Sequence, residues 1–163
     1  MGSAFETRTQ SSVLAMPRMV GGQLDMTLDV HPQDLGAVRA IVHAHTRLWR
    51  VEDSVADRIL TVVTELLTNV LQHTTPDQEG RRKADLLIQQ VADGMTAIVR
   101  DQDRCPPVLA PTDPLAENGR GLVLVRALTD DMSVSITGTG KDVWVFVADP
   151  ERLQPQSSPL VES

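Results

Sequence analysis

The sequence predicts an α+β fold of two layers, a two-layer α/β sandwich in which helices cover one face of a mixed, mostly antiparallel sheet. Two observations predict it. The expected elements follow in the order strand, two helices, β-hairpin, loop, helix and β-hairpin, which is not the alternating order of a doubly wound sheet. Apolar and polar residues alternate along the expected strands, as they do when one face of a sheet is buried.

One strand and two helices are expected in the first half of the chain. Residues 23–30 alternate apolar with polar side chains and predict a half-buried strand, which His31-Pro32 ends. A helix is expected from Asp34 to about residue 49. A second helix is expected from residue 52 or 53 to His73, because apolar residues recur along it at intervals of three and four.

A helix and two hairpins are expected in the second half. Asp93-Gly94 is a dipeptide typical of hairpin turns, and Gly138-Thr-Gly-Lys141 is interpreted as a second turn. Residues 102–118 contain four prolines and little periodicity, which predicts a loop long enough to act as a lid or binding segment. The elements around these turns are expected at residues 84–91, 95–101, 119–128, 132–137 and 142–147.

The length of the chain predicts one domain between two tails. With 163 residues it can form one domain with a real hydrophobic core, but not two ordinary ones. Residues 1–20 are polar and lack a sustained period, and residues 150–163 are polar and contain prolines. We therefore expect flexible tails at both ends and a folded domain over residues 21–149.

Composition excludes several classes of protein. No apolar run approaches the roughly 20 residues that span a bilayer, and no signal sequence is evident, so a cytoplasmic protein without membrane contact is expected. A net charge of -7 and only four aromatic residues disfavour direct binding of nucleic acid. The lone Cys105 forms no internal disulfide, and it is either incidental or a reactive thiol. A protein or small-molecule partner is favoured.

The second helix carries a polar set at intervals of four residues, namely Glu65, Asn69 and His73. Glu65 and Asn69 project in nearly the same direction, beside the apolar stripe, and His73 is expected to rejoin that stripe. A Glu can accept a proton from an attacking hydroxyl, and an Asn oxygen can bind Mg2+. The alternative is two polar residues on a solvated helix face.

Asp101 and the segment from Gly119 to Leu122 are two further candidates. Asp101 ends a strand and can accept a hydrogen bond from the exocyclic amine of adenine, or it merely starts a turn. Gly119-Arg-Gly121 precedes an apolar helix, so its backbone can hold phosphate, or the glycines simply turn the chain. Arg120 can contact phosphate or stay solvated. The spacing matches neither the P-loop nor the dinucleotide-binding motif.

Taken in order, these motifs resemble the N box and the glycine boxes of the GHKL ATPases, the superfamily of gyrase and the histidine kinases. The segments that carry the resemblance are Thr64-Glu-Leu-Leu-Thr-Asn-Val70, Gly119-Arg-Gly-Leu-Val-Leu-Val125 and Gly140-Lys-Asp-Val-Trp144. Over residues 22–148 the chain looks most like the small bacterial anti-sigma factor serine/threonine kinases and related actinobacterial ATP-binding regulators.

The resemblance implies the Bergerat ATP-binding fold, with ATP and Mg2+ as cofactors. Glu65 would be the general base, and Asn69 would ligate Mg2+, with His73 beside it in the nucleotide site. Asp101 would bind the adenine amine, and the backbone from Gly119 to Leu122, with Arg120 and Gly121, would hold phosphates. The partner would be an anti-anti-sigma protein of the STAS type or a sigma factor, and a homodimer is one option.

Two positions depart from the family pattern. Asp103 stands where the first glycine box has a glycine that lets the backbone approach adenine. Asp142 stands where a threonine often follows the last glycine box, so a hydrogen bond near the base is expected to be absent. Both changes are expected to affect nucleotide affinity, and neither touches Glu65 or Asn69.

Two functions from different classes fit the sequence. The first is an ATP-dependent protein serine/threonine kinase that acts in transcription regulation. The second is a regulator that keeps the fold and sequesters a partner with weak or no ATP binding. A sensor histidine kinase would need a separate helix bearing the accepting histidine, which His43 and His45 do not supply. An ATPase of the gyrase type would need further domains.

Overall fold

The computed structural model describes residues 19–105 and 120–153. The tails predicted over 1–20 and 150–163, and the loop predicted over 102–118, lie mostly outside these described residues. Within the predicted tails, the first strand already begins at Met19, and a four-residue helix, α5 (Pro150–Leu153), follows the last strand.

The described elements follow the predicted order. Pro32 occupies the start of a short 3-10 turn that leads into the first long helix, a position that suits its fixed backbone angle. The elements are β1 (Met19–Asp29), η1 (Pro32–Asp34), α2 (Leu35–Leu48), α3 (Asp53–His73), β2 (Lys83–Val91), β3 (Gly94–Asp101), α4 (Arg120–Leu128), β4 (Asp131–Ile136), β5 (Lys141–Ala148) and α5.

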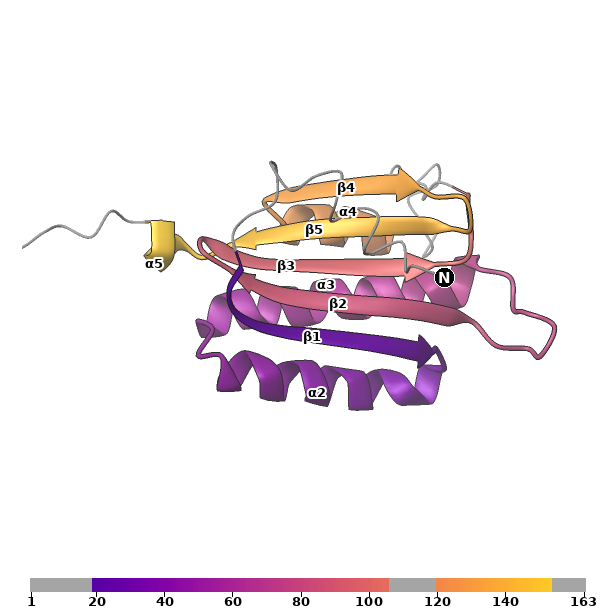
Figure 1. The fold of residues 1–163 in the computed structure, drawn as a ribbon, viewed down its shortest axis with the longest axis horizontal. Coiled ribbons are helices and arrows are strands. Elements are labelled where there is room, and N and C mark those ends of the chain that lie inside the picture. Colours follow the sequence, from indigo (N-terminus) through magenta and orange to yellow (C-terminus); the bar gives the residue numbers. More distant parts are fainter. Residues whose placement is uncertain (1–18, 106–119, 154–163) are drawn as a thin grey trace, which may run out of the picture.

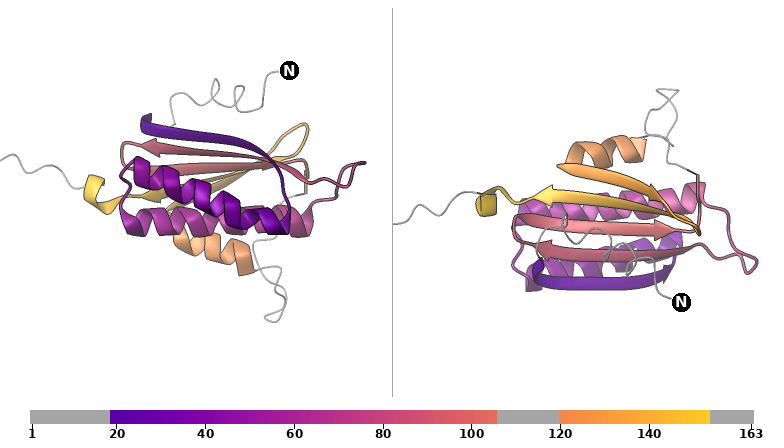
Figure 2. Two further views of the ribbon diagram at one scale, coloured as in Figure 1. Left: turned by 90° about the horizontal axis from the view of Figure 1, so that it is seen from below. Right: turned by 45° about the horizontal axis from the view of Figure 1, so that its top comes forward.

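The five strands form one sheet in the order β1-β2-β3-β5-β4. Each of the four described pairings is antiparallel, so the mostly antiparallel sheet expected from the sequence is confirmed, and no parallel pair is described. Helices α2, α3 and α4 lie together on one face of this sheet (Figure 1, Figure 2). The fold is therefore the predicted α+β arrangement of two layers.

The core lies between α3 and the helix-facing side of the sheet. The apolar stripe predicted along the second helix is the buried side of α3, and the inward residues of β2, β3 and β5 alternate with outward ones. Full burial of one such side chain stabilises the fold by about 1.5–3 kcal/mol. These buried residues include Val55, Ile59, Val62, Leu66, Val70, Leu86, Ile88, Met95, Ala97, Val99, Val143, Val145 and Val147.

The first hairpin forms, but its glycine serves a different purpose from the one predicted. Val91 pairs with Gly94, so the turn itself consists of Ala92 and Asp93. Gly94 belongs to β3, where a Cβ atom would lie 2.1 Å from the carbonyl oxygen of Val147 on β5. The absent side chain therefore allows two strands to approach closely, a common reason for glycine inside a sheet.

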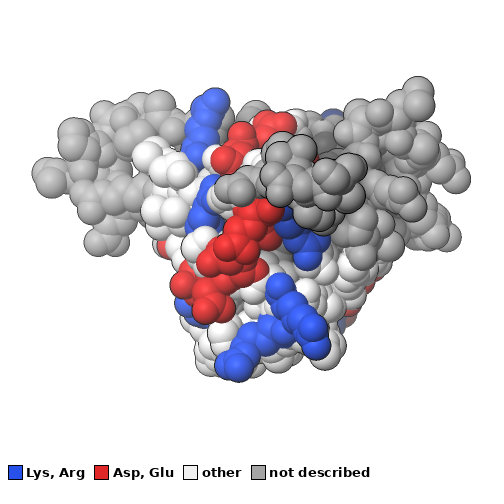
Figure 3. Space-filling model, turned by 90° about the vertical axis from the view of Figure 1, so that its left-hand side faces the viewer, with Lys and Arg blue, Asp and Glu red and all other residues white. Residues whose placement is uncertain are grey.

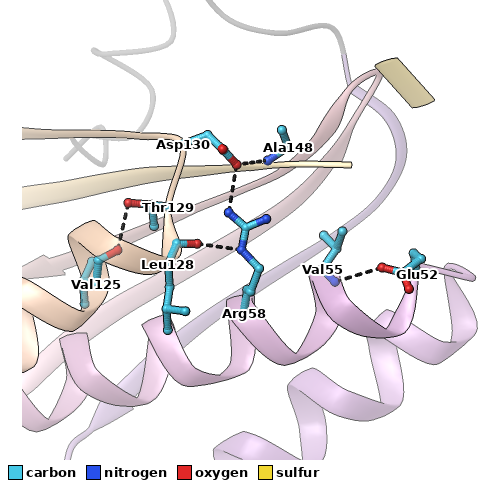
Figure 4. A network of polar contacts seen from close by, with 8 residues as sticks. All are labelled: Glu52, Val55, Arg58, Val125, Leu128, Thr129, Asp130 and Ala148. Carbon is cyan, nitrogen blue, oxygen red and sulfur yellow. Dashed lines mark hydrogen bonds and ion pairs between the residues drawn. The ribbon is translucent and has the colours of Figure 1, made fainter. Parts of the chain in front are cut away.

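Arg58 of α3 ties together the ends of α4 and β5 (Figure 4). Its Nε atom donates to the carbonyl oxygen of Leu128 at 2.9 Å, and its Nη2 atom lies 3.0 Å from Oδ2 of Asp130. The same Oδ2 accepts a hydrogen bond from the backbone N–H of Ala148 at 2.7 Å. A single guanidinium thus pairs with one of the carbonyl groups at the C-terminal end of α4 and connects this end to α3.

Charged side chains of both signs cover the end of the molecule at which α3 begins and β5 ends. In Figure 3 the Asp and Glu side chains form a band there, with Lys and Arg side chains on either side. This face is therefore not the one-signed basic surface typical of proteins that bind nucleic acid. Among the described helices, none combines the length and apolar character needed to cross a membrane.

Candidate functional site

Glu65, Asn69 and His73 lie on the C-terminal half of α3. Glu65 and Asn69 are half-buried, and the residue that follows each of them, Leu66 and Val70, is buried. The two polar side chains therefore lie along the margin of the core. His73 does not rejoin the apolar stripe as expected, because α3 ends there and leaves the imidazole exposed.

The side-chain amide nitrogen of Asn69 makes no hydrogen bond within the described part of the chain. This Nδ2 atom is also buried. An unsatisfied buried polar group costs about 1–3 kcal/mol, so a ligand that pairs with it gains affinity. The amide also carries the kind of oxygen that Mg2+ accepts, while phosphate oxygens and waters complete the shell of that ion. The amide oxygen of Asn69 therefore fits the role of a Mg2+ ligand, while its unpaired Nδ2 atom is a donor that would pair with an acceptor and not with the cation.

No carboxylate cluster assists Asn69 within the described part of the chain, where no three His, Cys, Asp or Glu side chains come together as a metal site.

Asp101 is buried at the C-terminal end of β3 and is paired with a lysine. Lys141, the first residue of β5, places its Nζ atom 3.1 Å from Oδ1 and 3.0 Å from Oδ2 of Asp101. Oδ1 also accepts a hydrogen bond from the backbone N–H of Asp103 at 2.8 Å. Burial raises the pKa of Asp101, and the hydrogen bonds from Lys141 and Asp103 offset part of that rise.

The reasoning from sequence missed Lys141, although a signal was present. Lys141 occupies the same alternation as the inward residues Val143, Val145 and Val147, so the strand pattern places it in the core. A lysine in the core needs a partner for its charge. Gly140 brings it into place, because a Cβ atom at that position would lie 1.8 Å from the carbonyl oxygen of Asp101.

Asp103 supports Asp101 through its backbone and points its own carboxylate elsewhere. Its Oδ1 atom accepts a hydrogen bond from the backbone N–H of Cys105 at 2.9 Å, which is the main reason that the pKa of Asp103 is lowered. The charges of Lys141 and His73 lower that pKa further. Asp103 in turn raises the pKa of the exposed Cys105, which makes a reactive thiolate less favourable.

Asp142 lies on the other face of the sheet from Lys141. Its carboxylate forms two hydrogen bonds with Arg100 of β3, Nε to Oδ1 at 2.7 Å and Nη2 to Oδ2 at 2.9 Å. The side chain of Asp142 is 1% exposed and that of Arg100 11% exposed. Since successive residues of a strand point to opposite faces, the carboxylate of Asp142 lies away from Asp101. This agrees with the expected absence of a hydrogen bond near the nucleobase, and it gives Asp142 no direct contact through which to change nucleotide affinity.

Changing Asp142 to asparagine is expected to destabilise the protein without changing its affinity for nucleotide. Removing one partner of a buried ion pair costs about 3–5 kcal/mol, because the other charge stays buried. Denaturant unfolding would measure the stability, and calorimetric titration with Mg-ATP would measure the affinity. The matched control is Asp25→Asn, an exposed carboxylate on the same face. A variant that is stable but binds nucleotide more weakly would place Asp142 in the site.

The predicted phosphate-binding segment lies partly outside the described residues. Gly119 precedes them, and α4 begins at Arg120 and includes Gly121. Leu122 is buried, and α4 packs against α3. The helix begins at the end of the molecule where α3 and β3 end and β5 begins (Figure 1). Its N-terminus therefore presents backbone N–H groups on the side that carries Asn69 and Asp101.

Four chemical groups thus lie on elements that reach the same end of the molecule: the carboxylate of Glu65 and the amide of Asn69 on the C-terminal half of α3, the buried carboxylate of Asp101 with Lys141, and the start of α4. A helix N-terminus suits phosphate, an amide suits a hard cation, and a buried carboxylate suits the amine of a base. The sequence predicted all four of these positions, Asp101 included, and the structure adds Lys141 as the partner of Asp101.

Comparisons with known proteins agree with this architecture. Residues 28–147 match the family model described as the histidine kinase-like ATPase domain. The RsbU and RsbW domains of Rv1364c from Mycobacterium tuberculosis are similar in structure, with a TM-score of 0.60 and 17% identity over 78% of this chain and 32% of that chain. The chain thus spans about a third of that protein's crystallised length.

A chain of the SiaB-SiaC complex from Pseudomonas aeruginosa is also similar, with a TM-score of 0.59 and 11% identity over 88% of this chain and 97% of that one. At these identities the likeness is one of fold. No curated protein matches the sequence. An ATPase domain implies ATP as its nucleotide, and the family match covers most of the chain. The protein belongs to the histidine kinase-like ATPase domain family.

Proposed function

We propose that this protein binds Mg-ATP and transfers the γ-phosphoryl group to a serine or threonine of a partner protein. The observation that carries the proposal is the arrangement on α3, where the half-buried Glu65 lies one turn from Asn69 and the amide nitrogen of Asn69 is buried and unpaired. A base, a metal ligand and a helix N-terminus at one end of the fold are the parts that phosphoryl transfer requires.

Each residue has a definite task in this reaction. Asp101 holds the adenine amine, the backbone of residues 119–122 holds phosphates, and Asn69 ligates Mg2+, which would neutralise phosphate charge. Glu65 accepts the proton of the partner's hydroxyl, so that the hydroxyl oxygen forms a bond to the γ-phosphorus while the bond to the β-phosphate oxygen breaks. ADP leaves with that oxygen, and Glu65 later releases the proton to solvent.

The proposed substrate is an anti-anti-sigma protein of the STAS type, with a sigma factor as the client held when that protein is phosphorylated. The protein would then act as an anti-sigma factor in transcription regulation, in the cytoplasm. The proposal is supported by the motifs on α3 and α4 and by the fold shared with the RsbW domain and the SiaB-SiaC complex. A second copy of the chain is the proposed oligomeric partner.

A second function is favoured by one contact. Lys141 already pairs with the carboxylate that would bind adenine, so nucleotide binding has an internal competitor. If ATP binds too weakly to be used, the same fold sequesters its partner without phosphoryl transfer.

Two measurements on the purified protein separate these functions. Titration with Mg-ATP by calorimetry tests binding, and incubation with labelled ATP and candidate anti-anti-sigma proteins tests transfer. Binding followed by labelling of a serine or threonine supports the kinase. Absence of binding up to millimolar Mg-ATP refutes it, and binding without transfer to any candidate supports sequestration.

A further inference from the structure

The ammonium group of Lys141 has an acceptor for each of its three hydrogens, and two of these acceptors are the carboxylate oxygens of Asp101. Its Nζ atom reaches both carboxylate oxygens, at 3.1 Å and 3.0 Å, and also lies 3.3 Å from the carbonyl oxygen of Asp103. These three acceptors match the three N–H donors of a lysine. The side chains of Lys141 and Asp101 are only 8% and 6% exposed. The pair therefore lies in the protein interior rather than on a solvated rim.

The carboxylate of Asp101 has little capacity left for another donor. A carboxylate offers about four acceptor positions. Lys141 approaches both oxygens, and the backbone N–H of Asp103 takes a further position on Oδ1. An exocyclic amine that reached this carboxylate would meet the lysine ammonium at the same atoms. Buried charged hydrogen bonds are costly to leave unmade, so the two donors cannot be independent.

The backbone around the pair is built to hold it. Asp101 and Lys141 are directly paired in the register of β3 and β5. Gly140 permits this approach, because a Cβ atom there would lie 1.8 Å from the carbonyl oxygen of Asp101 and 2.8 Å from its carbonyl carbon. The next register pair, Arg100 with Asp142, locks the two strands from the opposite face. The position of Lys141 is thus fixed by the sheet and not by a mobile loop.

We propose that Lys141 is an affinity-determining residue that competes with the nucleobase amine for the carboxylate of Asp101. This rests on the proposed function, in which Asp101 receives adenine. In the free protein the ammonium occupies the acceptor. Binding of a base that carries an exocyclic amine exchanges one donor for the other, so the amine contributes less to affinity than it would at an unpaired carboxylate.

The test compares two ligands on the whole protein. ATP carries the exocyclic amine, and purine riboside triphosphate lacks it but keeps the ring and the phosphates. Calorimetric titration of wild type, Lys141→Ala and Lys141→Gln with each Mg-nucleotide gives the affinities. The matched control is Lys83→Ala, which removes the chain's other lysine from the start of β2. Lys141→Gln keeps a neutral donor to Asp101, which guards against failure of the alanine variant to fold.

Lys141→Ala is expected to bind ATP about 10- to 100-fold more tightly than wild type, because a hydrogen bond to a charged group has a net effect of that size. The affinity of Lys141→Gln for ATP should rise by a smaller factor. Loss of Lys141 should raise the affinity for purine riboside triphosphate less than the affinity for ATP, and Lys83→Ala should leave both affinities unchanged. A variant with a damaged fold would instead bind both ligands more weakly, and by a similar factor.

Three results overturn the inference. If wild type binds ATP and both Lys141 variants bind it equally or more weakly, Lys141 does not compete and the proposed function stands. If the Lys141 variants bind both ligands more tightly by the same factor, Lys141 restricts the space for the nucleobase and does not compete with its amine. If neither wild type nor any variant binds Mg-ATP, the nucleotide-binding function itself fails, and the inference fails with it.

Discussion

Replacing Glu65 with glutamine is expected to reduce phosphoryl transfer to the partner by about 100- to 10,000-fold, the usual contribution of a general base. Glutamine has the shape of glutamate but does not accept the hydroxyl proton. Affinity for Mg-ATP is expected to stay unchanged, because in the proposed function Glu65 acts on the partner's hydroxyl and not on the nucleotide. Labelling of the partner by labelled ATP measures transfer, and calorimetric titration measures binding.

The control for this variant is Asp57→Asn, which neutralises an exposed carboxylate two turns earlier on the same helix. It should transfer phosphate at the wild-type rate. Wild-type transfer by Glu65→Gln would exclude Glu65 as the base. Loss of ATP binding together with transfer would show instead that Glu65 shapes the nucleotide site.

Asn69→Ala is expected to weaken binding of Mg-ATP by about 10- to 100-fold or more. In metal sites generally, loss of a group that only supports a ligand has an effect of this size, so loss of the ligand itself should have at least as large an effect. The loss should depend on the metal, so that wild type and variant bind ATP equally in the presence of a chelator. Stability should not fall much, because the variant also removes a buried amide nitrogen without a partner. Titrations with and without Mg2+ and denaturant unfolding check these results.

Gln72→Ala is the matched control, since Gln72 is an exposed carboxamide on the last turn of the same helix. A variant Asn69→Ala that loses affinity equally with and without Mg2+ would argue against metal ligation. If Asn69→Ala unfolds at a lower denaturant concentration than wild type, the side-chain amide of Asn69 contributes to the stability of the core.

Most of the fold could be predicted because each element carries a strong local period. The apolar stripe of α3 and the alternation in β2 and in most of β5 determine both the type of element and its buried side. The sequence predicts Gly94 in a turn because the contact that requires a glycine there is not local. Its neighbour Val147 lies on a strand more than 50 residues later, so the close contact exists only once β3 and β5 are paired.

The candidate site was harder to predict than the fold, and the two acidic departures show why. The sequence places Asp142 just beyond the last glycine box and so associates it with the nucleobase, but strand alternation sends its side chain to the opposite face, where it pairs with Arg100. The pairing of Asp101 with Lys141 depends on the register between strands that are not neighbours in sequence. Local patterns report periodicity well, but they do not report which distant charge will share a buried position.

The hydrogen bond from Arg58 to Leu128 holds the C-terminal end of α4 in place, so a tilt of this helix would displace its N-terminal end most. The helix has nine residues, so it is about 13 Å long, and a tilt of about 10° around Leu128 would carry its first turn through about 2 Å. In the proposed function, where the start of α4 holds phosphate, such a tilt would move the phosphate-binding turn most and Leu128 least. Under the same proposal, a substitution of Arg58 would remove the hydrogen bond that holds the end of α4 and would act on nucleotide binding without contacting the nucleotide.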